Sequence, residues 1–132
     1  MKNRLYICLL TISVITLFYG CRDRSFHKRA DYQEVMKYHD EAMIEMGVIH
    51  NLGKKLKKID LSSTPDNSQI EKMIVDLENA DEGMMAWMAQ FKAHNHKEEL
   101  DTYLADQLVK VKKVHTDIFN SINAAKKYLN EE

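Results

Sequence analysis

The sequence predicts an all-α protein: an elongated, antiparallel, up-down-up three-helix bundle on an N-terminal lipid tether. Composition is the first indication, because the 132 residues include four Gly and one Pro and 30% of them are charged, which favours helices over sheets. Periodicity is the second, because apolar residues recur three and four positions apart in three successive segments of residues 31–132. Short connections between these segments make neighbouring helices antiparallel.

The first 20 residues have the three-part anatomy of an export signal. Lys2 and Arg4 form a basic start, an apolar run extends from Leu5 to Tyr19, and the chain turns polar after Cys21. This order is typical of a secretory signal, and its apolar run is shorter than a membrane-spanning helix needs. We therefore expect residues 1–20 to be a signal peptide.

The Gly20-Cys21 junction resembles the lipobox of bacterial lipoproteins, although Phe18 and Tyr19 stand where the usual pattern has Leu and a small residue. The resemblance implies that residues 1–20 are removed and that Cys21 carries lipid on its sulfur and on its new amino group. Several acyl chains anchor a protein firmly where one is marginal. An uncleaved anchor helix and a cleaved soluble protein are the alternatives, and all three place the body outside the cytoplasm.

Residues 21–30 are predicted to form a flexible tether between the lipid and the bundle. The segment is polar and basic, with Arg22, Arg24, Lys28 and Arg29, and it has little to bury. Basic segments next to a membrane also contact anionic lipid headgroups, so the two roles are compatible.

The first helix of the bundle is predicted to begin at Asp31, which can cap the N-terminus with Glu34 at the reciprocal position of a capping box. Four lysines near the end of this helix complement the negative pole of its dipole. Its apolar stripe consists of Tyr32, Val35, Met36, Met43, Met46, Ile49, Leu52, Leu56 and Ile59.

The second helix is predicted to follow the turn at residues 60–67, with Ser68 and Glu71 as its capping box. His94-Asn95-His96 interrupts the pattern and ends the helix. Its stripe consists of Ile70, Met73, Ile74, Leu77, Ala80, Met84, Trp87, Met88 and Phe91.

The third helix is predicted to run from about residue 97 to residue 129, with Glu98 and Glu99 at its positive N-terminal pole. Its stripe consists of Leu100, Tyr103, Leu104, Leu108, Val111, Val114, Ile118, Ile122, Ala125 and Leu129.

Two glycines lie inside predicted helices, where glycine costs about 1 kcal/mol relative to alanine. Gly47 and Gly83 would approach one another if the first two helices pair antiparallel. That juxtaposition suggests a close helix contact or a place where a partner's backbone docks.

A group of soft side chains is the candidate metal site. On the first helix, His39, Met43 and Met46 share one face, and on the second, Met84 and Met88 are one turn apart. Antiparallel pairing would bring the two groups to one level, beside Trp87. Thioether sulfur and imidazole suit copper(I), and an aromatic face attracts a cation. Methionine is also a common gap-filler in helical cores, so packing is the plainer interpretation.

Other chemistry has little basis in the sequence. The mature part contains no cysteine beyond Cys21, which excludes a disulfide and a thiolate site in the folded body. A net charge of −1 for the whole chain argues against a nucleic-acid partner. Phosphate loops, nucleophile elbows and zinc-protease motifs are missing, so we expect no enzyme and no cofactor. A weak zinc or nickel site at His94 and His96, with His27, is a further alternative.

Three stretches resemble a family of small Bacteroidota-type lipoproteins. They are residues 39–43, residues 80–91, which read ADEGMMAWMAQF, and residues 121–129, which read SINAAKKYL. The resemblance implies location and a helical fold, and no activity. In that group an acidic run after the lipidated cysteine marks export to the cell surface, and Arg22-Asp23-Arg24 departs from such a run. We therefore expect an outer-membrane anchor facing the periplasm.

The function predicted from these observations is a non-catalytic interaction or scaffolding module of the cell envelope. Its partners would be the membrane, through the lipid, and an envelope protein or a second copy of the chain. The alternative is a periplasmic copper-binding protein that uses His39, Met43, Met46, Met84 and Met88.

Overall fold

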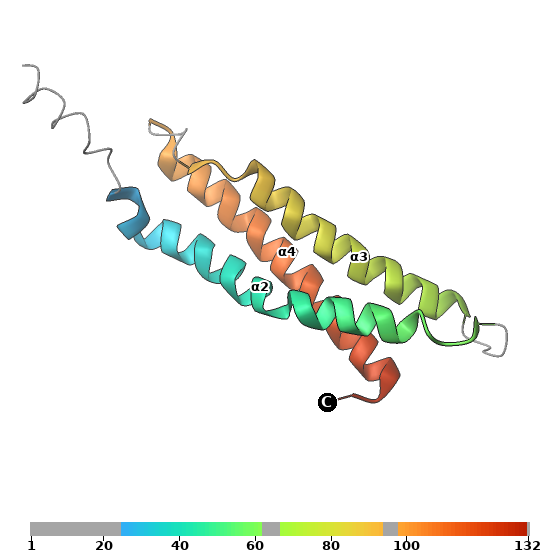
Figure 1. Cartoon of the computed structure of the whole chain (residues 1–132). Helices are drawn as coiled ribbons and strands as arrows, with labels where there is room; N and C mark the ends of the chain where they lie inside the picture. The colour runs from blue at the N-terminus through green and yellow to red at the C-terminus, as the bar shows by residue number, and fades with distance from the viewer. Residues whose placement is uncertain (1–24, 62–66, 94–97, 132) are drawn as a thin grey trace, which may run out of the picture. The chain divides into compact units, whose positions relative to one another are not determined.

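Three long helices make up the bundle, and there is no strand in residues 25–61, 67–93 and 98–131, which this computed structural model describes (Figure 1). They are α2 (Ala30–Leu56), α3 (Asn67–Gln90) and α4 (Leu100–Leu129). With 27, 24 and 30 residues, they are about 36–45 Å long at 1.5 Å per residue. The predicted all-α three-helix bundle is confirmed.

The chain divides into two units, residues 1–30 and residues 31–132. The described portion of the first unit contains a short 3-10 helix, η1 (Ser25–Lys28). The amide of Arg29 donates a hydrogen bond of 3.1 Å to the carbonyl of Phe26, and the Phe26 and His27 rings are 3.9 Å apart. The predicted signal peptide and Cys21 lie outside the described residues. In the part of the chain that is described, no helix is both long enough and apolar enough to cross a membrane.

Contacts between the helices fix their directions. Near the 62–66 connection, Lys57, which directly follows α2, donates a hydrogen bond of 2.6 Å to Glu78 of α3. Far from that connection, His39 of α2 meets Met88 of α3. The first two helices of the bundle are therefore antiparallel, as Figure 1 shows. Lys112 of α4 bonds to Glu34 near the start of α2, and Glu131 bonds to Lys55 near its end. Hence α4 runs parallel to α2, which completes the up-down-up order.

The core consists of the predicted stripes. The side chains that are least accessible include Leu52, Leu56, Ile70, Leu77, Met84, Leu104, Val111 and Ile118. The other stripe residues are buried or partly buried, and most of the partly buried ones pack against this cluster. Ala42 is also fully buried, and the polar residues Gln107 and Ser121 are each only 6% exposed. The apolar faces of the three helices therefore cover one another.

The backbones of α3 and α4 approach each other most closely. Ala80, Ser121 and Ala124 lie between these two helices, and small side chains permit a short distance between helix axes. Larger groups separate α2 from its neighbours: His39 packs near Trp87 of α3, and Tyr38 packs against His115 of α4. Side-chain size at the seams thus sets the spacing of the bundle.

The helix ends differ slightly from prediction. The first helix begins one residue earlier, at Ala30, and the Asp31 carboxylate accepts a hydrogen bond of 2.9 Å from the amide of Tyr32. The second begins at Asn67, so Ser68 lies inside it. The third begins only at Leu100, with no side-chain cap at Glu99. Such shifts of one to three residues are typical of helix ends, which fray and carry weak sequence signals.

A left-handed residue ends α4. Asn130 has φ 54° and ψ 40°, and the amide of Glu131 donates a hydrogen bond of 2.9 Å to the carbonyl of Lys126. Asparagine tolerates this conformation better than most residues, and the resulting bond satisfies a carbonyl that the helix leaves unpaired.

Gly47 and Gly83 are not at a tight helix contact, contrary to the first interpretation of their spacing. A Cβ atom built on either residue meets nothing within 4 Å outside its own helix turn. Both glycines have helical backbones without positive φ, so alanine fits the existing conformation. Glycine loses more backbone entropy on folding than alanine does, and no close packing at these two positions compensates for that loss.

We expect Gly47→Ala and Gly83→Ala each to stabilise the fold by up to about 1 kcal/mol, the usual difference in helix propensity. Equilibrium urea unfolding followed by circular dichroism measures the change. The double variant should approach the sum, because the two substitutions share no partner. A loss of stability in either variant would show that the glycine backbone is needed.

Candidate functional site

The contact between His39 and Met88 is the most specific chemical feature of the bundle. Nε2 of His39 lies 3.1 Å from the sulfur of Met88, and Nδ1 lies 2.8 Å from Oδ1 of Asp40. The His39 side chain is 17% exposed, and Met88 is partly buried against the core. An imidazole nitrogen and a thioether sulfur therefore meet at the edge of the α2–α3 seam, within reach of solvent.

The predicted methionines divide into two environments. Met46 and Met84 belong to the core, with exposed fractions of 8% and 0%. Met43 is only partly buried, as is Met88. Of the five residues in the candidate metal site, Met46 and Met84 therefore belong to the core. His39, Met43 and Met88 lie near the surface of the α2–α3 seam.

Met85 is a soft residue beside this seam that the sequence analysis did not select. Asp81 lines the groove between α2 and α3, and Met88 contacts His39 across the same seam. Met85 lies four residues after Asp81 and three before Met88, which places it on the same helix face. It is 48% exposed. The apolar stripe of the second helix includes Met84, so the pattern assigns the adjacent Met85 to the exposed face. Met85 was left out of the candidate metal site for that reason.

Trp87 stands behind the His39–Met88 contact. Its ring stacks on Phe91 with centroids 4.9 Å apart, and the His39 ring is 5.7 Å away at 38°. The residue is 6% exposed. Its Nε1 is buried, and no described residue accepts a hydrogen bond from it. An electron-rich aromatic face therefore lies close to the imidazole and sulfur pair.

A second aromatic cluster occupies the α2–α4 seam, and its histidine was not among the residues selected from the sequence. The His115 ring stacks on Phe119 at 4.4 Å and meets Tyr38 edge-on at 5.3 Å. Lys112 lies 5.0 Å from the centre of the Tyr38 ring. The hydrogen bond from Lys112 to Glu34 raises the pKa of this lysine above its ordinary value, and nearby charge adds to that direction. The spacing of residues 112, 115 and 119 on one helix face was the available signal.

His115 Nε2 lies 3.2 Å from a carboxylate oxygen of Glu41. This contact is not a hydrogen bond, and the nitrogen is buried. The cluster therefore holds α2 against α4 through ring packing and the Lys112–Glu34 ion pair, and we assign it a structural role.

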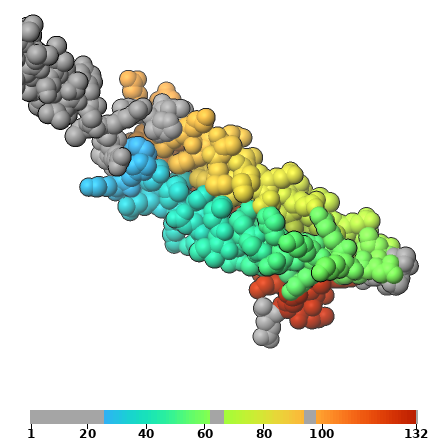
Figure 2. Space-filling view, viewed as in Figure 1, coloured from blue at the N-terminus to red at the C-terminus, as the bar shows by residue number. Residues whose placement is uncertain are grey.

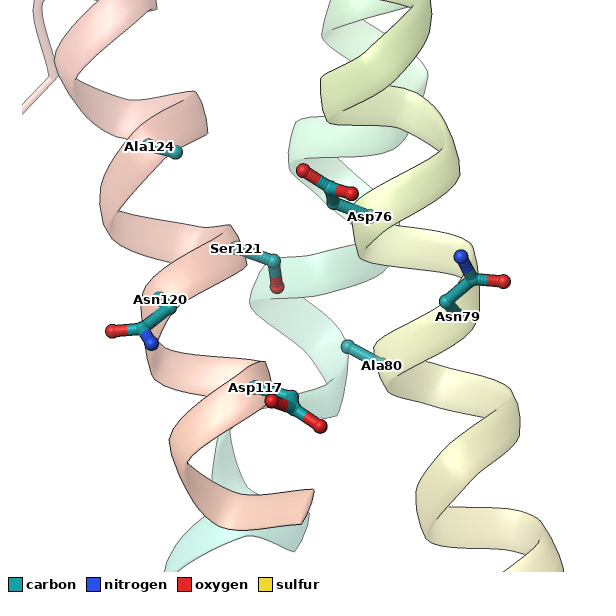
Figure 3. A pocket seen from close by; sticks show the side chains of 7 residues that line it. All are labelled: Asp76, Asn79, Ala80, Asp117, Asn120, Ser121 and Ala124. Atoms are coloured by element: carbon teal, nitrogen blue, oxygen red, sulfur yellow. The ribbon is translucent and has the colours of Figure 1, made fainter. Parts of the chain in front are cut away.

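A groove of about 400 Å³ lies between α3 and α4. Asp76 and Asn79 line one side and Asp117 and Asn120 the other, with Ala80, Ser121 and Ala124 between them. Figure 3 shows Ala80 and Ser121 pointing into the space between the two helices. The hydroxyl of Ser121 donates a hydrogen bond of 2.9 Å to the carbonyl of Ile118. The groove thus has a floor of small side chains and rims of carboxylates and amides.

Each carboxylate of this groove has a lysine partner on its own helix. Lys72 bonds to Asp76 at 2.5 Å, and Lys113 bonds to Asp117 at 2.6 Å. These pairs are exposed, and such pairs contribute little to stability. A partner's cation could therefore replace either lysine at small cost.

A smaller groove of about 290 Å³ lies between α2 and α3. His50 and Lys54 line it from α2, Lys57 lines it from the turn that follows α2, and Glu78 and Asp81 line it from α3. His50 Nδ1 donates a hydrogen bond of 2.8 Å to the carbonyl of Met46. Within the described residues, no three His, Cys, Asp or Glu side chains converge as a metal site. The alternative site at His94 and His96 lies outside those residues.

Searches of protein-family models, curated proteins and solved structures find no match to this chain. The site geometry and the sequence patterns are therefore the basis for the functional proposals.

Proposed function

We propose that the protein is a non-catalytic, lipid-anchored module of the outer membrane, facing the periplasm, and that it docks an envelope protein through the α3–α4 groove. The groove is the observation that carries the proposal. The Gly20-Cys21 junction after a basic and apolar leader supports the anchor, and Arg22-Asp23-Arg24 supports the periplasmic face.

The rest of the described surface offers less to a partner. The large apolar side chains that are well exposed are Ile44, Val75, Met85 and Val109. They come from three different helices, and scattered exposed apolar residues are ordinary on a protein surface. Elsewhere the outer faces carry ion pairs four residues apart, such as Lys110 with Asp106. The α3–α4 groove is larger than the α2–α3 groove, at about 400 Å³ against about 290 Å³, and it combines carboxylates and amides with a floor of small side chains.

The groove suits a polar segment that carries lysine or arginine. The amides of Asn79 and Asn120 can both donate and accept, so they can pair with a partner's backbone. Asp76 and Asp117 supply acceptors for a cation, and charged hydrogen bonds are the stronger kind. The small floor lets the segment approach the helices closely.

Photo-cross-linking in native membranes tests this proposal. A photoreactive residue at Asn120 should give a cross-linked protein, and one at Asn51, which is exposed on α2, should not. Ala124→Gln adds a side chain to the groove at an exposed position and should abolish the Asn120 product. Ala105→Gln is the matched control on an exposed part of the same helix outside the groove.

Persistence of the product in Ala124→Gln would contradict docking in the groove. A product with twice the mass of the chain would identify a second copy as the occupant, instead of a different envelope protein.

A further inference from the structure

We propose that His39, Met43, Met85 and Met88 form a binding site for copper(I) on the α2–α3 seam. This function is independent of the docking proposal, because the seam and the α3–α4 groove share no residue. This set differs from the one that the sequence suggests, because it includes Met85 and excludes the core residues Met46 and Met84.

The hydrogen bond to Asp40 prepares His39 to bind a metal. A carboxylate only accepts hydrogen bonds, so Nδ1 donates in the 2.8 Å contact to Asp40. In the neutral imidazole, Nε2 then carries a lone pair, and it faces the Met88 sulfur at 3.1 Å. Metal-binding histidines commonly have this carboxylate on the second nitrogen, which fixes the tautomer and raises the basicity of the ligating one.

The facing atoms gain from a cation. In the neutral state a nitrogen lone pair and a sulfur lone pair oppose one another with no proton between them. Zinc bonds to histidine nitrogen and to thiolate sulfur are roughly 2.0–2.3 Å long. At bond lengths of that order, one ion beside the pair can reach both atoms with a small adjustment. The thioether is flexible and polarisable, which makes that adjustment easy.

Two further sulfurs are positioned to complete the site. Met43 lies one turn after His39 on α2, and Met85 lies nearly one turn before Met88 on α3. Because these helices are antiparallel, Met43 and Met85 both lie on the same side of the His39–Met88 contact along the bundle. Figure 2 shows α2 and α3 lying side by side along one face. Met43 is partly buried, and Met85 is 48% exposed, so both can rotate toward an ion without opening the core.

The ligand chemistry selects copper(I). One imidazole and up to three thioethers make a soft, uncharged set, which suits copper(I) better than zinc or other hard divalent ions. The Trp87 ring, 5.7 Å from the His39 ring, adds attraction for a cation. Trp87 is also the only tryptophan in the sequence, so its fluorescence reports directly on this place.

A copper(I) titration of the full-length chain in detergent, in competition with a colorimetric copper(I) chelator, tests the proposal. Cys8 and Cys21 are changed to Ser throughout, because thiolates also bind copper(I). We expect one ion to bind, with quenching of the Trp87 fluorescence. His39→Ala and Met88→Leu should each weaken binding by more than about tenfold, and Asp40→Asn by about tenfold, the lower end of the effect of second-shell changes.

Leucine in place of methionine keeps the volume and removes only the sulfur, so these variants separate ligation from folding. Met43→Leu and Met85→Leu should weaken binding, whereas the core controls Met46→Leu and Met84→Leu should leave it unchanged. Circular dichroism verifies that each variant is folded. Failure of the cysteine-free chain to compete for copper(I), or equal binding in Met88→Leu, would refute the site.

Discussion

Ile118→Ala should lower the free energy of unfolding by about 2–5 kcal/mol, the range for removing a buried isoleucine. The side chain is fully buried in α4 and belongs to the core cluster that all three helices share. Its loss removes apolar contacts and leaves a cavity that the surrounding helices fill only in part. Small domains have free energies of unfolding of about 5–15 kcal/mol. The substitution therefore removes a large fraction of the total stability.

Ile44→Ala is the matched control, because it makes the same chemical change on the outer face of α2, where Ile44 is 77% exposed. Alanine has a higher helix propensity than isoleucine by a few tenths of a kcal/mol, so this variant should be neutral or slightly more stable. Urea unfolding of both variants under one set of conditions makes the comparison. Similar losses in the two proteins would mean that the helices do not bury their stripes as the structure shows.

The contrast between these two isoleucines also explains why the fold was predictable. Ile118 lies in a stripe with a period of three and four, and that pattern alone predicts which face is buried. Ile44 lies outside its stripe and is exposed. Ala42 and Ser121 are buried although neither was in a predicted stripe, because small residues give a weak apolar signal while fitting the narrowest spaces between helices.

Contacts between helices were less predictable than the helices themselves. Antiparallel pairing places His39 near residues 81–88, but sequence spacing alone does not decide whether Met84, Met85 or Met88 meets it. The rotation of α3 decides this: it buries Met84, leaves Met85 exposed and brings the Met88 sulfur to the imidazole. His115 and Tyr38 come together for the same reason, through the rotation of α4 against α2.

Trp87→Ala should be the other strongly destabilising change, costing about 3–5 kcal/mol, the usual range for truncating a buried tryptophan. The indole is 6% exposed and contacts two other rings, since it stacks on Phe91 and lies beside His39. Its removal opens a cavity at the junction of α2 and α3. It also removes the favourable ring packing that aromatic pairs contribute beyond their buried area.

Trp87→Phe separates these terms. Phenylalanine keeps a ring in contact with Phe91, and it removes the indole Nε1, which is buried with no hydrogen-bond acceptor among the described residues. An unsatisfied buried donor costs about 1–3 kcal/mol, and relief of that cost offsets part of the lost packing. We therefore expect the phenylalanine variant to lose less than half as much stability as the alanine variant, measured by circular dichroism in urea. Equal losses would show that the indole nitrogen makes a favourable interaction in solution, and that Trp87 stabilises the bundle through that nitrogen as much as through its ring.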